Sequence, residues 1–126
     1  MNSHVAVISL YADDVEKAVN FYQNIVGFYL VSPGGVDGDN RPHFRLGATY
    51  LALLKGTPQP ALTEKPVRFP ILAVAVDDID GAVARLRANQ VELPWGIEAN
   101  SQARWVMFYD PAGNLIELVQ SARGVI

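Results

Sequence analysis

A sequence unit that occurs twice is the feature that most constrains the fold of this chain. In each copy, a short apolar segment is followed by two aspartates, an aliphatic residue, two further positions and an Ala-Val pair. The aspartate pairs begin at Asp13 and Asp77, and the pairs Ala18-Val19 and Ala82-Val83 follow at the same distance. Because a unit repeated at fixed spacing indicates duplicated modules, we expect two modules of similar structure.

Each copy of the unit predicts a strand followed by a helix. The apolar segments, residues 5–10 and 71–76, are rich in valine and isoleucine, as buried strands are. The aspartate pairs can accept hydrogen bonds from free N–H groups at a helix start. Gly27 is a suitable end for the first helix or its loop. The apolar residues of the two helices recur with helical spacing: Val15, Ala18, Val19 and Tyr22, then Ile79, Ala82, Val83 and Leu86.

Three further strands are expected after each helix, at residues 28–31, 43–46 and 49–54, then 91–93, 104–109 and 115–120. A loop rich in glycine and aspartate spans residues 32–42, and a strong turn signal spans 110–114. Residues 56–69 contain three prolines and are typical of a linker. The predicted fold class is α+β, with two βαβββ modules at residues 5–55 and 70–120 within a single domain of 1–126.

Composition narrows the classes of function. The chain has no cysteine, so disulfides, thiol nucleophiles and cysteine-based metal sites are excluded. Ten basic and thirteen acidic residues give a net charge of −3, so we expect no nucleic-acid partner. The longest apolar run, residues 71–76, is far shorter than the roughly 20 residues of a membrane helix. With no targeting segment apparent, we expect a cytoplasmic protein without a membrane partner.

Two segments carry a resemblance to a known family. Residues 14–22, followed by Gly27-Phe28, and the segment 108–118 resemble the vicinal-oxygen-chelate superfamily. That superfamily includes glyoxalase I, extradiol dioxygenases, fosfomycin-resistance enzymes and bleomycin-resistance proteins. The resemblance covers about residues 5–120 and implies that the two modules form a half-open mixed β cup with the helices outside. It also implies that the functional site lies on the wall of this cup.

The resemblance also bears on metal binding. Metal-dependent members place a His or Glu ligand on the first and last strand of each module, which corresponds here to Val7, Ala52, Ile71 and Glu117. Aliphatic side chains offer no lone pair, so we expect no metal and no cofactor. The chain looks closest to the metal-free bleomycin-resistance-like members, which carry a segment similar to Pro94-Trp95-Gly96.

Candidate ligand contacts are small, aromatic or polar residues of the expected cup. Ser9 could leave room for a bulky ligand, or could only allow close packing of strand and helix. Trp95 and Trp105 could stack on a flat ligand, or could be core or dimer contacts. His43 could line the crevice or lie at the surface. The other candidates are Phe44, Tyr50 and Met107.

Glu117 is the most informative charged residue, because a carboxylate on an otherwise aliphatic strand is costly unless it has a partner. Three roles are open. Glu117 could pair with Arg104, it could contact a cationic or hydroxyl group of a ligand, or it could be a weak candidate for a catalytic base.

The leading hypothesis is metal-independent binding and sequestration of a bulky, partly aromatic small molecule, such as an antibiotic or another natural product. The alternative is a metal-dependent lyase, isomerase or transferase of the glyoxalase or fosfomycin-resistance type. Whether the chain is an enzyme is thus open, with a binding protein favoured, and a cup that holds a cofactor or peptide fragment is a third reading. The resemblance further implies a homodimer, with modules paired within one chain or exchanged between chains.

Overall fold

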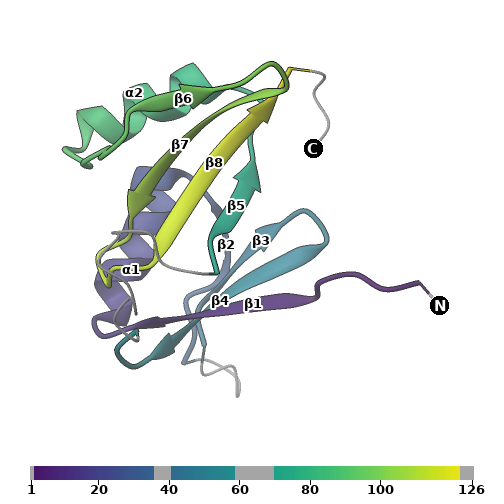
Figure 1. Cartoon of the computed structure of the whole chain (residues 1–126). Coiled ribbons are helices and arrows are strands. Elements are labelled where there is room, and N and C mark those ends of the chain that lie inside the picture. The colour runs from purple at the N-terminus through teal and green to yellow at the C-terminus, as the bar shows by residue number, and fades with distance from the viewer. Residues whose placement is uncertain (1, 36–40, 59–69, 123–126) are drawn as a thin grey trace. The chain divides into compact units, whose positions relative to one another are not determined.

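The computed structural model describes residues 2–35, 41–58 and 70–122 (Figure 1). The chain divides into two compact units, Met1–Gln59 and Pro60–Ile126, which we call module one and module two. The loop expected at residues 32–42 and the linker expected at 56–69 lie partly outside the described residues. Among the helices of the described ranges, none is long and apolar enough to cross a membrane.

Module one contains one four-stranded sheet and one helical segment. The strand order is β1-β4-β3-β2, with β1 parallel to β4 and the other neighbours antiparallel. The strands at 29–32, 43–46 and 49–55 match the sequence prediction closely, and the first strand begins two residues later than expected. The elements are β1 (Val7–Ala12), α1 (Val15–Asn20), η1 (Phe21–Val26), β2 (Tyr29–Ser32), β3 (His43–Leu46) and β4 (Thr49–Lys55).

The first helix begins and ends at the residues that the sequence indicated. The Asp14 carboxylate accepts a hydrogen bond of 3.0 Å from the Lys17 backbone N–H. The helix continues as the π-helical segment η1, which ends at Gly27. Gly27 has a φ of 93°, a left-handed conformation that favours glycine. Its N–H donates to the Tyr22 carbonyl at 3.0 Å, so both the predicted cap and the predicted stop are confirmed.

The core of module one lies between the helical segment and one face of the sheet. Tyr22 is fully buried, with its ring 5.7 Å from that of Phe44 and 5.8 Å from that of Phe28. Leu51 and Leu53 of β4 are buried on the same side as Phe44. Because successive side chains of a strand point to opposite faces, the residues between these belong to the other face.

Module two repeats this arrangement, with strand order β5-β8-β7-β6 and β5 parallel to β8. The two modules confirm the predicted α+β class and the βαβββ repeat. The described core of module two lies between α2 and one sheet face, and includes Ile79, Val106, Phe108, Ile116 and Leu118. Its elements are β5 (Leu72–Ala75), α2 (Ile79–Ala88), β6 (Ile97–Ala99), β7 (Ala103–Tyr109) and β8 (Leu115–Ser121).

One predicted strand is wrong. Residues 91–93 do not form a strand, and β6 lies instead at Ile97–Ala99. The Val91 N–H donates to the Leu86 carbonyl at 3.0 Å, which ties this apolar segment to the end of α2. A turn follows, closed by a 3.1 Å hydrogen bond from the Gly96 N–H to the Leu93 carbonyl, with Gly96 at a φ of 62°. The chain therefore joins the sheet only after Gly96.

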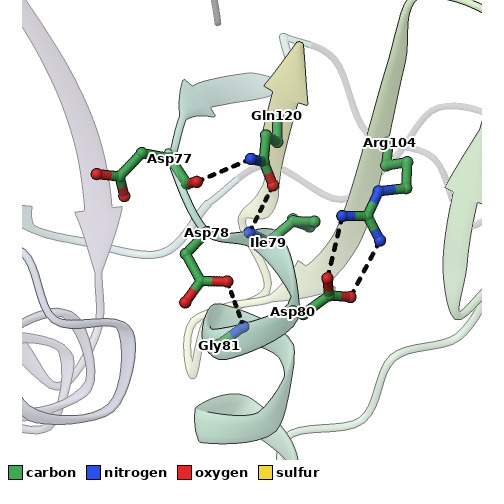
Figure 2. Close-up of polar contacts among 7 residues, drawn as sticks. All are labelled: Asp77, Asp78, Ile79, Asp80, Gly81, Arg104 and Gln120. Atoms are coloured by element: carbon green, nitrogen blue, oxygen red, sulfur yellow. Dashed lines mark hydrogen bonds and ion pairs between the residues drawn. The ribbon is translucent and has the colours of Figure 1, made fainter. Parts of the chain in front are cut away.

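The start of α2 is fixed by the capping side chain of Asp78 and by the Gln120 side chain of β8 (Figure 2). The Asp78 carboxylate accepts a hydrogen bond of 3.0 Å from the Gly81 N–H. The Gln120 side chain of β8 accepts from the Ile79 N–H at 2.9 Å and donates to the Asp77 carbonyl at 2.8 Å. These contacts attach the helix start to β8.

An exposed ion pair adds a contact to β7. The two terminal nitrogens of Arg104 lie 3.0 and 3.1 Å from the two carboxylate oxygens of Asp80 (Figure 2). Hydrogen bonding to Arg104, and then its positive charge, lowers the pKa of Asp80. Arg104 therefore points to the helix-covered side of the sheet.

The predicted turn between β7 and β8 is also confirmed. One oxygen of the Asp110 carboxylate accepts from the Asn114 N–H at 2.8 Å and from the Ala112 N–H at 3.0 Å. The other oxygen accepts from the Asn114 side-chain amide at 2.9 Å. These bonds satisfy two buried polar side chains and set the register of β7 against β8.

Candidate functional site

Each sheet has one face that, within the described part of its own module, carries no helix. In module one we call this open face one. Several of its large apolar side chains are exposed, with Tyr29 at 68% and Val7 at 51%. The alternation of side chains along paired strands assigns these residues to it: Val7, Ser9, Tyr11, Tyr29, His43, Arg45, Tyr50, Ala52 and Leu54.

The strand register brings three of the predicted site residues together on open face one. Ser9 is paired with Ala52, and Ala52 is paired with His43 on the other side. The His43 ring meets the Tyr50 ring edge to face, with 5.7 Å between the ring centres. His43 Nδ1 also lies 3.2 Å from the Arg41 carbonyl oxygen, so the ring orientation is set by two contacts.

Phe44 does not join this group, and its predicted role as a ligand contact is corrected here. Its side chain is 0% exposed and packs against Tyr22 on the helix-covered side of the sheet. His43 and Phe44 are adjacent on one strand, so they point to opposite faces. The sequence alone did not show which face the helix covers.

Module two has a corresponding surface, open face two. The residues that share it are Ala73, Ala75, Glu98, Trp105, Met107, Tyr109, Leu115, Glu117 and Val119. The odd-numbered residues of β7 are thus the ones that point away from α2, which the sequence left undecided. Glu117 lies between Ala73 and Met107 in register, and Trp105 lies between Val119 and Glu98. The predicted residues Trp105, Met107 and Glu117 are therefore neighbours.

Trp95 lies next to this face. It occupies the turn before β6, and its ring centre is 6.4 Å from that of Tyr109. Tyr109 belongs to open face two, so the contact places the indole beside its aromatic residues. Gly96 at positive φ shapes the turn that holds Trp95 there.

The suggested pairing of Glu117 with Arg104 is wrong. Arg104 stands opposite Gln120 in the register, three residues from Glu117, so the two side chains point to opposite faces. Arg104 binds Asp80 instead (Figure 2). Partial burial raises the pKa of Glu117, and the negative charge of Glu98 raises it further.

Glu98 is a site residue that sequence reasoning missed. Its Oε1 atom is buried and makes no hydrogen bond among the residues that the structure describes. An isolated glutamate between Ile97 and Ala99 is the same signal that drew attention to Glu117. The strand expected at residues 91–93 leaves Glu98 outside the predicted sheet. Together, the two carboxylates can accept hydrogen bonds from cationic or hydroxyl groups.

Comparison with known proteins shows the family to which the chain belongs. The model of the Glyoxalase/Bleomycin resistance protein/Dioxygenase superfamily matches residues 3–118. The chain belongs to this superfamily. This result confirms the resemblance that the helix and turn segments carried.

Three similar proteins illustrate the range of the superfamily. The uncharacterized protein YaeR of Escherichia coli K12 is 33% identical over 127 residues, which cover 93% of each chain. TnmS3, an antibiotic binding protein from Streptomyces sp. CB03234, is 30% identical with a TM-score of 0.76 and coverage of 96% and 98%. A glyoxalase/dioxygenase from Nostoc punctiforme is 25% identical with a TM-score of 0.77 and coverage of 94% and 90%.

The residues of this chain do not fit the metal that some members of the superfamily bind. Of the four corresponding positions, Val7, Ala52 and Ile71 offer no donor atom, and Glu117 offers one carboxylate. Across residues 2–35, 41–58 and 70–122, no three His, Asp or Glu side chains come together in a way that could hold a metal ion. We therefore derive no chemical step through a metal.

Proposed function

We propose that the protein binds a bulky, partly aromatic small molecule, such as an antibiotic or another natural product, without a metal. The observation that carries this proposal is the set of aromatic side chains on sheet faces that no helix of their own module covers in the described residues. Large aromatic side chains on a rigid sheet offer area for stacking and burial to a flat ligand. The proposed ligand contacts are Ser9, His43, Tyr50, Trp95, Trp105, Met107 and Glu117.

Open face two offers apolar area on which a ligand can stack and carboxylates that can orient its polar groups. Trp105 and Met107 are adjacent along β7, and the small side chains of Ala73 and Ala75 leave space beside Glu117. A ligand that stacks on the indole can direct a hydroxyl or ammonium group to the carboxylates of Glu98 and Glu117. A buried carboxylate oxygen without a partner is costly, so such a group would stabilise the bound state.

One of the similar proteins supports a binding function. TnmS3, at 30% identity over nearly the full length of both chains, is described as an antibiotic binding protein. The aliphatic residues at Val7, Ala52 and Ile71 also remove the donors that metal-dependent members use.

An enzymatic alternative rests on one residue. Glu117, whose pKa is raised by burial and then by the charge of Glu98, is the candidate general base of such a reaction. This alternative would make the protein a lyase, isomerase or transferase, in line with the similarity to a glyoxalase/dioxygenase. Turnover of a ligand, with product detected by mass spectrometry, would favour it over sequestration.

Tryptophan fluorescence tests the proposal directly, because Trp95 and Trp105 are the only tryptophans of the chain. We expect planar aromatic antibiotics to quench or shift the emission in a saturable manner. The variants Trp95→Phe and Trp105→Phe each retain one reporter and should show weaker binding, with Trp105→Phe the more affected. Unchanged emission across a broad panel of flat compounds would contradict the proposal.

A further inference from the structure

Arg45 occupies an unusual position on open face one. The register forms a continuous row across all four strands of module one, in the order Val7, Tyr50, Arg45, Tyr29. The guanidinium carbon of Arg45 lies 5.8 Å from the ring centre of Tyr29 and 6.0 Å from that of Tyr50. Both distances are within the range of cation–π contacts, so the cation is held between two aromatic rings.

Among the described residues, no carboxylate neutralises the charge of Arg45. Within the described residues, Arg45 forms no ion pair, and its contacts are the two tyrosine rings. The four strands of module one contain no aspartate or glutamate. The acidic residues that are described in this module, Asp13, Asp14 and Glu16, lie just before or within α1. Open face one therefore carries a positive charge with no acidic partner in the part of module one that the structure describes.

We propose that open face one recognises a planar aromatic ligand through a carboxylate group that binds to Arg45. This inference rests on the proposed function and specifies the chemical class of its ligand. The planar guanidinium offers N–H donors in a fixed geometry that matches two carboxylate oxygens. Tyr29 and Tyr50 on either side offer rings against which the aromatic part of the ligand can pack.

The surroundings of Arg45 favour an acid over an amine. His43 lies two residues from Arg45 on β3, so both side chains are on the same face of the sheet. The His43 ring contacts Tyr50, which places a second nitrogen-bearing side chain close to the row of Val7, Tyr50, Arg45 and Tyr29. The remaining neighbours in register, Val7 and Ala52, are apolar. An ammonium group placed here would face Arg45 without a compensating carboxylate, whereas an anionic group would gain hydrogen bonds that its neutral analogue cannot make.

Isothermal titration calorimetry with two matched probes tests this inference. Naphthalene-2-carboxylate and 2-naphthalenemethanol share the same ring system and differ in the charge of one group. We expect the wild-type protein to bind the carboxylate about tenfold more tightly than the alcohol, as charge-assisted hydrogen bonds do. In Arg45→Gln this preference should disappear, and Arg45→Lys should retain only part of it because lysine lacks the planar fork.

Lys55→Gln is the matched control. Lys55 belongs to β4 of the same sheet, but its side chain is on the opposite face from Tyr50. Lys55→Gln removes one positive charge, as Arg45→Gln does, and leaves open face one unchanged. We expect Lys55→Gln to keep the preference for the carboxylate within about twofold, since it removes only a distant, screened charge. Circular dichroism would confirm that each variant is folded.

Two results would overturn the inference. Equal affinity of the wild-type protein for both probes would exclude recognition of the acid while leaving aromatic binding intact. No measurable binding of the carboxylate would also overturn it. In that case the fluorescence titration with planar antibiotics decides separately whether the proposed function fails as well.

Discussion

At the scale of single residues, the electrostatics of open face two depend on Glu117. Burial and the charge of Glu98 raise its pKa from the ordinary value of 4.5, so the folded protein holds its proton more tightly than the unfolded chain does. Stability is therefore lost as the pH rises from the ordinary value through the raised value. The raised pKa means that ionisation of Glu117 costs more free energy in the folded protein than in the unfolded chain.

We predict that Glu117→Gln stabilises the protein at pH 7 by about 0.2–1 kcal/mol, the range of partly screened charge pairs on adjacent strands. Urea unfolding at a series of pH values would measure this gain. The gain should shrink towards zero below pH 4.5, where the wild-type side chain is protonated in both states. A gain that is constant across the pH series would contradict the assignment.

The two opposite faces of the sheet in module one give a second prediction at this scale. Phe44 fills the core against Tyr22, so Phe44→Ala should lower the free energy of unfolding by about 3–5 kcal/mol. Tyr50→Ala removes a half-exposed ring from open face one, and should weaken ligand binding at a much smaller cost in stability. Thermal unfolding and ligand titration of both variants would separate these roles. Similar losses of stability in the two variants would show that the faces are misassigned.

At the scale of elements, the two aspartates of each repeated pair have different roles, and only the structure shows which one caps the helix. The second aspartate of each pair accepts the hydrogen bond from the first helical turn, at Asp14 and at Asp78. We predict that Asp78→Ala destabilises the protein by about 1 kcal/mol, the usual cost of a lost helix cap.

Asp77→Ala is the control for this prediction, because Asp77 contributes a backbone carbonyl to Gln120 that alanine retains (Figure 2). Its effect on the midpoint of chemical unfolding should be small. Equal destabilisation by both variants would show that the cap is not the source of the effect.

Most elements could be predicted from the sequence because their signals are local. The helix starts, the Gly27 stop and the turn at Asp110 depend on residue types within a few positions. The β6 strand could not be predicted this way, because Val91 is hydrogen-bonded to the end of α2 and the chain joins the sheet only at Ile97. Register is also non-local, so neither the Arg104–Asp80 pair nor the proximity of Glu98 to Glu117 could be predicted.

At the scale of the whole molecule, the chain is a duplicated module whose two copies differ in charge. Open face one carries Arg45 and His43, and open face two carries Glu98 and Glu117. The two modules share one topology but carry different residues on their open faces, and one fold can serve different ligands in this way.

We also predict that the protein forms a homodimer, as the resemblance to its superfamily implied. Multi-angle light scattering should give twice the mass of the 13.8 kDa chain over a range of micromolar concentrations. A mass of one chain at all concentrations would contradict this prediction. A cytoplasmic location remains a further expectation from the sequence.

The central claim is that this chain binds an aromatic ligand without a metal. The most direct test compares ligand affinity, by tryptophan fluorescence, in protein stripped with a chelator and in the same protein after addition of zinc, nickel or manganese. We expect the same affinity in both samples, because Val7, Ala52 and Ile71 offer the metal no donors. Loss of binding on chelation, with recovery on addition of one stoichiometric metal ion, would contradict it.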